Sequence, residues 1–182
     1  MWDGSSRAED LSPCLVHLSE DPSITRFVPR PASALPGSPA VVWAIGEARA
    51  PHYWLPRECP RIVFWANPET TADDAGRFLV PGPVRKVIAV EAAWLGRIRA
   101  ATLYAYSLPN ETFTLVDDQA GYFVSRDPVE PSAVAPVGDL LERIVGKGIE
   151  VRLTPRLGPL RDALVASTMG YSMIRLRNAA PG

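Results

Sequence analysis

The sequence is poor in the features that define several large classes of protein. Only two cysteines and two histidines occur in 182 residues, too few for a disulfide framework, and we expect no metal site. No apolar run reaches the roughly 18 residues of a membrane-spanning helix. The opening residues, MWDGSSRAED, lack the basic start and apolar stretch of a signal peptide. We therefore expect a cytoplasmic protein that does not cross a membrane.

The chain also lacks an excess of either positive or negative charge. Lys and Arg number 19 against 20 Asp and Glu, and no block of like charges occurs, so we expect no nucleic-acid partner. Lysine is scarce: 17 of the basic residues are arginine and two are lysine. Composition bias accounts for such a ratio, which alone supports no function. The hydrophobic fraction of 47% is typical of a folded domain. We expect a loose tail at residues 1–12 and a single globular domain at 13–182.

Nineteen prolines and thirteen glycines divide the chain into short segments. Apolar runs bounded by these residues predict strands. Thr followed by early acidic residues predicts a capped helix, and the four prolines of one segment predict a loop. The expected elements are strands at 14–19, 40–45, 61–66 and 85–92, helices at 70–79 and 137–148, an antiparallel meander at 102–126 and a loop at 28–39. Adjacent strands with irregularly inserted helices favour an α+β fold with antiparallel, split sheets.

The segment CLVHLS contains the candidate binding residues of the first strand. Leu15, His17 and Ser19 point to one face, and the alternate residues can fill a core. Histidine both donates and accepts hydrogen bonds, and with a neighbouring hydroxyl it suits a ribose diol or a phosphate oxygen. The alternative is that a nearby carbonyl satisfies His17 while Ser19 and Asp21 form a turn. Arg30 carries a planar fork suited to phosphate, or else forms an ion pair with an acidic neighbour.

Several short motifs carry a resemblance to known families. The segment from Leu15 to Tyr53 contains His-x-Ser, Ile-x-x-Phe-x-Pro-Arg and Val-Val-Trp-Ala, and it resembles the amino-terminal part of ADP-ribosyltransferase-like bacterial proteins, with Leu18 in place of a glycine. The segment 121–137 resembles the closing strand pair of that superfamily. The whole chain also resembles a bacterial family of uncharacterised proteins with a shared HVSE…FxPR start, which supplies no activity.

The first resemblance implies an ADP-ribosyltransferase-like fold and NAD as a cofactor. It implies that His17 binds the NAD ribose and that Ser19 matches the serine that follows. Tyr53 is the nearest match for the aromatic residue that stacks on nicotinamide, with Trp43 and Trp54 as alternatives. Ordinary core packing is the competing interpretation of these aromatic residues.

One departure from the superfamily pattern bears on catalysis. Catalytic members carry a glutamate or similar group at the start of the closing strand, where this chain has Ala120 or Gly121. Asp117 lies just before, in a stretch that reads equally well as a turn. Two hypotheses follow: an ADP-ribosyltransferase-type protein that binds NAD or a related nucleotide through His17, Ser19, Arg30 and Tyr53, and a non-catalytic binding or interaction domain. The sequence assigns no catalytic residue and no oligomeric state.

Overall fold

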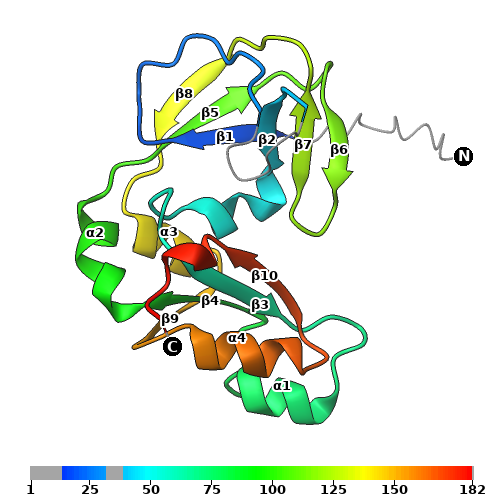
Figure 1. Cartoon of the computed structure of the whole chain (residues 1–182), viewed down its shortest axis with the longest axis vertical. Helices are drawn as coiled ribbons and strands as arrows, with labels where there is room; N and C mark the ends of the chain where they lie inside the picture. Colours follow the sequence, from blue (N-terminus) through cyan, green and yellow to red (C-terminus); the bar gives the residue numbers. More distant parts are fainter. Residues whose placement is uncertain (1–13, 32–38, 182) are drawn as a thin grey trace, which may run out of the picture.

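A computed structural model describes residues 14–31 and 39–181. The tail expected at residues 1–12 and most of the loop expected at 28–39 lie outside the described residues. The described chain forms two β-sheets, which make up the upper and lower halves of the molecule in Figure 1. Short helices lie between the two sheets and beneath the lower one. The α+β architecture with mainly antiparallel sheets is therefore confirmed.

The upper sheet has six strands in the order β6-β7-β2-β1-β5-β8, and all neighbouring pairs are antiparallel. The strands are β1 (Leu15–Ser19), β2 (Val42–Gly46), β5 (Tyr104–Leu108), β6 (Thr114–Asp117), β7 (Tyr122–Ser125) and β8 (Ala133–Pro136). β1, β2 and β7, which correspond to three strands expected from apolar runs, are all interior strands.

The lower sheet has four strands in the order β10-β3-β4-β9. They are β3 (Arg61–Trp65), β4 (Lys86–Glu91), β9 (Glu150–Thr154) and β10 (Gly170–Ile174). β4 and β9 form the one parallel pair in the described part of the chain. β3 and β4 are buried on both faces, which explains why their sequences are nearly continuous apolar runs rather than alternating ones.

Helices occupy the space between the sheets and the lower face of the molecule (Figure 1). They are the 3₁₀ helices η1 (Glu47–Tyr53), η2 (Ala92–Trp94) and η3 (Leu176–Asn178), and the α-helices α1 (Ala72–Phe78), α2 (Leu95–Ala100), α3 (Leu140–Gly146) and α4 (Gly158–Val165). The predicted cap of α1 is present, because the Thr71 side chain accepts a hydrogen bond from the Asp74 backbone N–H at 3.2 Å. Such a cap satisfies a donor that the first helical turn leaves free.

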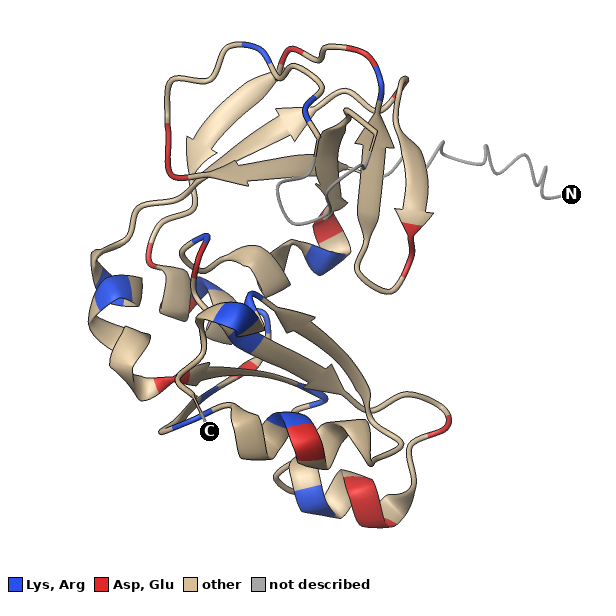
Figure 2. Ribbon diagram, viewed as in Figure 1, with Lys and Arg blue, Asp and Glu red and all other residues tan. Residues whose placement is uncertain are grey.

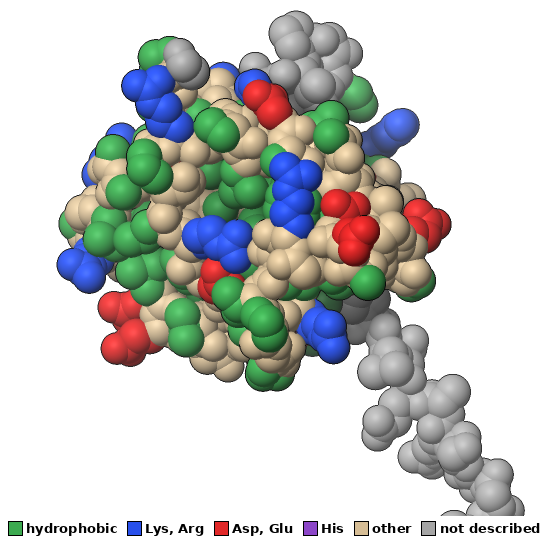
Figure 3. Space-filling view, turned by 90° about the horizontal axis from the view of Figure 1, so that it is seen from below, with side chains coloured by type: hydrophobic (Ala, Val, Ile, Leu, Met, Phe, Trp, Pro, Cys, Tyr) green, Lys and Arg blue, Asp and Glu red, His purple; other side chains and the backbone are tan. Residues whose placement is uncertain are grey.

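Three apolar clusters hold the layers together. The first lies between the sheets and combines Val16 and Leu18 of β1 with Val63 of β3 and Ile144 of α3. The second packs the lower sheet against α1 and α4. Seen from that side, apolar side chains gather in and around a hollow, with basic side chains over it (Figure 3). The third cluster covers the outer face of the upper sheet.

The meander expected at 102–126 is only partly correct. β6 and β7 form a hairpin, but β5 pairs with β1 and β8 instead of with β6. β8 has no local apolar signal, because its four residues are exposed and contain no alternating apolar pattern. Only the resemblance of 121–137 to a closing strand pair pointed to a strand in this region. Local sequence patterns identify strands but do not identify their partners when the partners are distant along the chain.

Candidate functional site

His17 lies on β1, where it is paired across the sheet with Tyr106 of β5. Its ring Nδ1 is 2.8 Å from the carbonyl oxygen of Trp43, to which it donates a hydrogen bond. The ring centroid is 4.6 Å from that of Phe27, which also packs edge-on against Tyr106. The side chain therefore lies against the segment that covers the outer face of the upper sheet.

Burial lowers the pKa of His17, and the positive charge of Arg57 lowers it further, while the hydrogen bond to Trp43 acts in the opposite direction. The net pKa lies below the usual value, so the ring is neutral at neutral pH. A neutral ring that donates from Nδ1 keeps Nε2 as an acceptor. This geometry matches the alternative in which a nearby carbonyl satisfies His17, and the binding role of His17 stays a prediction.

Ser19 shares the sheet face of His17, and its hydroxyl takes part in a turn. Its Oγ accepts a hydrogen bond from the Asp21 backbone N–H at 3.1 Å. Asp21 Oδ1 in turn accepts from both the backbone and the side chain of Ser23. Arg30 is further along the same segment, where its backbone pairs with Val41 in both directions. The Arg30 side chain is exposed.

Tyr53 is the last residue of η1 and packs against the hairpin β6–β7. Its ring centroid is 5.7 Å from that of Tyr122, and its hydroxyl donates to the Ala120 carbonyl at 3.4 Å. Burial raises the pKa of the Tyr53 hydroxyl well above its usual value, so the hydroxyl stays protonated. Of the two alternative aromatic residues, Trp54 is buried in the core between the sheets, and Trp43 packs edge-on against Tyr122.

The structure does not bring these four predicted residues together. On β7, Phe123 joins the outer cluster that contains the His17 neighbours Phe27 and Tyr106, whereas Tyr122 contacts Tyr53. Successive strand residues point to opposite faces, so His17 and Tyr53 lie on opposite faces of the upper sheet. The four residues therefore do not surround one ligand in this structure, and the binding role of each residue by itself stays a prediction.

The residues just before β7 occupy the position where the resemblance to ADP-ribosyltransferases implies a glutamate. Asp117 Oδ1 accepts a hydrogen bond from the Ala120 backbone N–H at 2.9 Å. Gly121 follows with a positive φ of 70°, a conformation that glycine adopts without strain. The stretch therefore forms a turn, and the Asp117 side chain is engaged in it.

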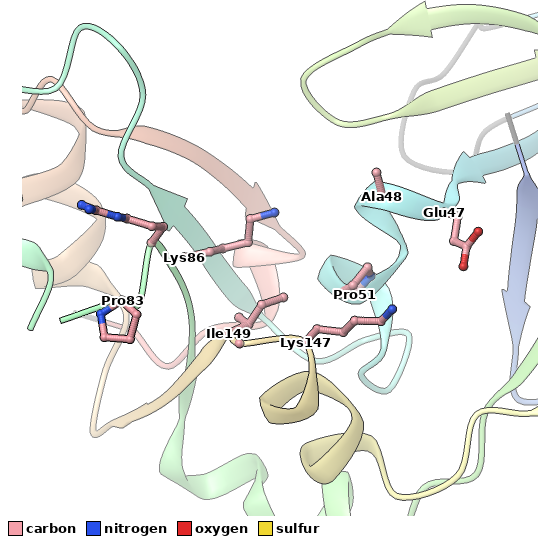
Figure 4. Close-up of a pocket in the computed structure, with 9 residues that line it drawn as sticks. Glu47, Ala48, Pro51, Pro83, Lys86, Lys147 and Ile149 are labelled. Carbon is pink, nitrogen blue, oxygen red and sulfur yellow. The ribbon is translucent and has the colours of Figure 1, made fainter. Parts of the chain in front are cut away.

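An open cavity of about 670 Å³ lies where η1 faces the beginning of β4 and the end of α3 (Figure 4). Its lining residues are Glu47, Ala48, Pro51, Pro83, Arg85, Lys86, Lys147, Gly148 and Ile149. They come from three segments that are far apart in sequence and contain no recognised motif, which is why sequence reasoning missed the cavity. One signal was present, because the chain has only two lysines and both line this cavity.

The lining of the cavity is basic. Arg85, Lys86 and Lys147 face a single acidic residue, Glu47, and the ion pairs found within the described residues involve none of these three cations. Elsewhere on the molecule, acidic and basic residues are interspersed (Figure 2). Unpaired cations around one cavity make it a place where an anion gains electrostatic attraction without displacing a carboxylate.

Beside the cavity, four side chains form what we call the Trp65 cluster: Arg49, His52, Trp65 and Lys86. The Arg49 guanidinium carbon and the Lys86 Nζ are 5.4 Å and 5.9 Å from the centroid of the Trp65 ring. The His52 ring stacks on Trp65 with centroids 5.8 Å apart. Cations at such distances from an indole ring are attracted by its electron-rich face. The cluster thus fixes two cations next to the cavity.

Two glycines allow the Trp65 cluster to pack closely. A Cβ added to Gly121 would lie 2.5 Å from Arg49 Cγ, and one added to Gly170 would lie 2.6 Å from Trp65 Nε1. Both distances are well inside van der Waals contact, so any larger residue would displace the cluster. Arg49 therefore rests on the backbone of the upper sheet while its charged end lies over a residue of the lower sheet.

The cations of the cluster perturb their neighbours. Burial lowers the pKa of His52 to about 3, assisted by the charges of Lys86, Arg49 and Arg61. Burial also lowers the pKa of Lys86, and Arg49 lowers it further. His52 is fully buried, and neither of its ring nitrogens has a hydrogen-bond partner among the described residues. At neutral pH the cluster therefore contains a neutral imidazole and an amine that loses its proton more easily than usual.

Arg61 helps to hold the Trp65 cluster in place through hydrogen bonds to the backbone. It is 3% exposed and donates hydrogen bonds to the backbone carbonyls of His52, Pro56 and Cys59. These bonds hold the chain that follows η1 against the first residue of β3. The position of His52 is thereby fixed through its backbone while its side chain stacks on Trp65.

Among the residues described, no helix is long and apolar enough to cross a membrane. Cys14 and Cys59 are both free thiols, and no three metal-ligating side chains gather within the described ranges.

The fold and the cavity together define an α+β protein whose two sheets are joined by a helical layer with a basic cavity at its edge. The chain belongs to a family described as "Family of unknown function (DUF6886)", which it matches over residues 16–179. No curated protein and no solved structure matches the chain. The family is consistent with the expected uncharacterised family, and no comparison supports the resemblance to ADP-ribosyltransferases.

Proposed function

We propose that this chain binds a phosphorylated small molecule of the nucleotide class, NAD among the candidates, in the cavity between η1, β4 and α3. The observation that carries the proposal is the convergence of Arg85, Lys86 and Lys147 on one cavity with no ion pair to any of them among the described residues. Cationic side chains form charge-assisted hydrogen bonds with phosphate oxygens, which are stronger than neutral ones.

The neighbouring Trp65 cluster supports a nucleotide over a simple anion. Arg49 adds a fourth cation near the cavity, and its guanidinium group can form two parallel hydrogen bonds with a phosphate. Trp65 provides aromatic surface next to Arg49 and Lys86, and the Tyr53 ring stacks on His52 of the same cluster. A ligand with a planar heterocycle and a phosphate group would match both features. Tyr53 lies on η1, the helix that also contributes Glu47 and Pro51 to the cavity, so it stays the candidate for the aromatic contact expected from the sequence.

A more specific version of this proposal is that the protein transfers ADP-ribose from bound NAD. The motifs between Leu15 and Tyr53 and the split antiparallel sheets favour it. The turn at Asp117, Ala120 and Gly121 offers no glutamate for the transfer step. This last observation favours the second candidate, a non-catalytic domain that binds the nucleotide without cleaving it. Loss of nicotinamide from bound NAD separates the two candidates.

The test is calorimetric titration with NAD, ADP-ribose, ADP and inorganic pyrophosphate, supported by thermal unfolding. A ligand present at one hundred times its dissociation constant adds about 2.7 kcal/mol to the free energy of unfolding. We expect binding to weaken at higher salt, because the attraction is between charges. If none of the four compounds binds the wild-type protein, the proposal is wrong.

Matched variants locate the site. Lys147→Gln removes a cavity charge from an exposed position, and we expect it to weaken binding at least several-fold. Arg26→Gln is the control, because it removes one exposed charge from the segment that covers the other face of the upper sheet. His17→Ala should leave the affinity of the folded protein unchanged. If His17→Ala abolishes binding and Lys147→Gln does not, the ligand lies at the first strand instead.

A further inference from the structure

The two lysines of this chain share one location. Of 19 basic residues, three line the cavity, and both lysines are among these three. Arginine serves as the cation at all other positions, and it binds phosphate well. Lysine differs from arginine in one chemical respect that matters here: its amine can lose a proton and act as a nucleophile, whereas guanidinium stays protonated.

Lys86 has the surroundings that activate an amine. It is the first residue of β4, is half-buried, and lies with Arg49 against the ring of Trp65. The other charged groups that line the cavity are Arg85, Lys147 and Glu47. None of the ion pairs recorded within the described residues holds Lys86. A lysine that is desolvated next to another cation is a better nucleophile at neutral pH.

The amine is also accessible. Figure 4 shows Lys86 and Lys147 reaching from the side of the lower sheet and α3 toward η1, on which Ala48 and Pro51 lie. Lys147 is exposed at the end of α3 and serves as an internal reference. A ligand whose phosphate is held by the surrounding cations would place its remaining atoms within the same cavity.

We propose that Lys86 is a nucleophilic amine that forms an imine with an aldehyde or ketone group of a phosphorylated ligand in the cavity. The inference rests on the proposed function for the position of the ligand. The neutral Nζ attacks the carbonyl carbon, and the carbonyl oxygen becomes a hydroxyl group. Both hydrogens of the amine then leave with that oxygen as water, and a carbon–nitrogen double bond remains. The step needs no oxidant or reductant.

The experiment uses pyridoxal 5′-phosphate as a phosphorylated aldehyde and pyridoxal as its counterpart without phosphate. Borohydride converts each imine to a stable secondary amine, and peptide mass mapping then measures the label on Lys86 and Lys147. At neutral pH we expect Lys86 to be labelled several-fold faster than Lys147. Its rate should also reach a plateau at a lower pH, because its pKa is lowered by burial and by Arg49. Equal labelling of the two lysines at all pH values would overturn the proposal.

Conservative variants exclude an indirect effect. Lys86→Arg keeps the charge and removes the amine, so the fast phase of labelling should disappear. Arg26→Gln, which removes an exposed charge outside the cavity, should leave that phase intact. The unfolding midpoint of each variant shows whether it is folded. If Lys86→Arg folds and the fast phase persists at another amine, Lys86 is not the nucleophile.

The two aldehydes separate this inference from the proposed function. If the cavity holds phosphate, pyridoxal 5′-phosphate labels Lys86 faster than pyridoxal does, and inorganic pyrophosphate slows the reaction. Equal rates for the two aldehydes, with Lys86 still faster than Lys147, would overturn the phosphate site and keep the reactive amine. Slowing by pyrophosphate without any preference for Lys86 would keep the phosphate site and overturn the reactive amine.

Discussion

The buried imidazole of His52 predicts a specific loss of stability in mild acid. Its pKa is lowered to about 3 in the folded protein, while an unfolded chain has a histidine pKa of about 6.5. Between these values the unfolded state binds a proton that the folded state does not. The free energy of unfolding must therefore fall as the pH falls below about 6.5.

The magnitude follows from the two pKa values. Integrating the difference in bound protons from pH 7 to pH 5 gives a loss of about 2 kcal/mol for this one group. The result depends almost entirely on the unfolded-state pKa, because the folded state hardly titrates above pH 5. Two kcal/mol is a large part of the 5–15 kcal/mol that is typical of a folded domain.

The assay is urea denaturation at fixed ionic strength, followed by the fluorescence of the five tryptophans. The comparison is between wild type and His52→Phe, which keeps an aromatic ring between Tyr53 and Trp65. The variant should be at least as stable at pH 7, because it removes two buried nitrogens that lack partners. It should lose about 2 kcal/mol less than wild type between pH 7 and pH 5.

Other titrating groups cancel in this comparison. His17 also has a lowered pKa and contributes with the same sign, but it is present in both proteins, as are all carboxylates. If wild type and His52→Phe lose stability in parallel over this pH range, His52 is not held neutral, and the electrostatic account of the Trp65 cluster is wrong.

Two further predictions concern structural residues. Glu91 is 2% exposed and accepts hydrogen bonds from the backbone N–H groups of Leu157 and Ala180. Glu91→Ala should therefore lower the free energy of unfolding by about 2 kcal/mol, and Glu91→Gln should lower it by less. Equal urea midpoints for wild type and Glu91→Ala would contradict this prediction. Cys14 is exposed, whereas Cys59 is buried and its pKa is raised to about 11. A thiol reagent should therefore modify Cys14 at once and Cys59 only on unfolding. Peptide mapping of the treated native protein checks this difference.

Local sequence signals predicted much of the secondary structure. The apolar runs of β1, β3 and β4 and the Thr71 cap of α1 are local features, and each was found near the expected boundaries. Local patterns did not predict β8, because an exposed edge strand has no apolar face to reveal it. The partners of β5 escaped for a different reason: its neighbours β1 and β8 lie on either side of it in the chain, and strand pairing at such distances has no local signature.

The site was harder to predict than the fold. The shared face of His17 and Ser19 follows from strand geometry, but the segment that covers this face is set by tertiary contacts such as Phe27 on His17. The basic cavity joins Glu47, Lys86 and Lys147, which have no common motif. The one relevant signal in the sequence was that lysine is scarce, and this signal became informative only when the structure placed both lysines in the cavity.

The order of strands in the two sheets has a consequence for how the protein is made. The upper sheet takes β1 and β2 from the first part of the chain and β5 to β8 from the middle, while the lower sheet takes β3 and β4 from between them and β9 and β10 from the end. The lower sheet cannot close until late in synthesis, because β9 must be present before β4 gains its parallel neighbour. Contacts between such distant segments slow folding. A ribosome-bound chain that stops after β8 would expose the apolar edge of β4, a surface prone to aggregation.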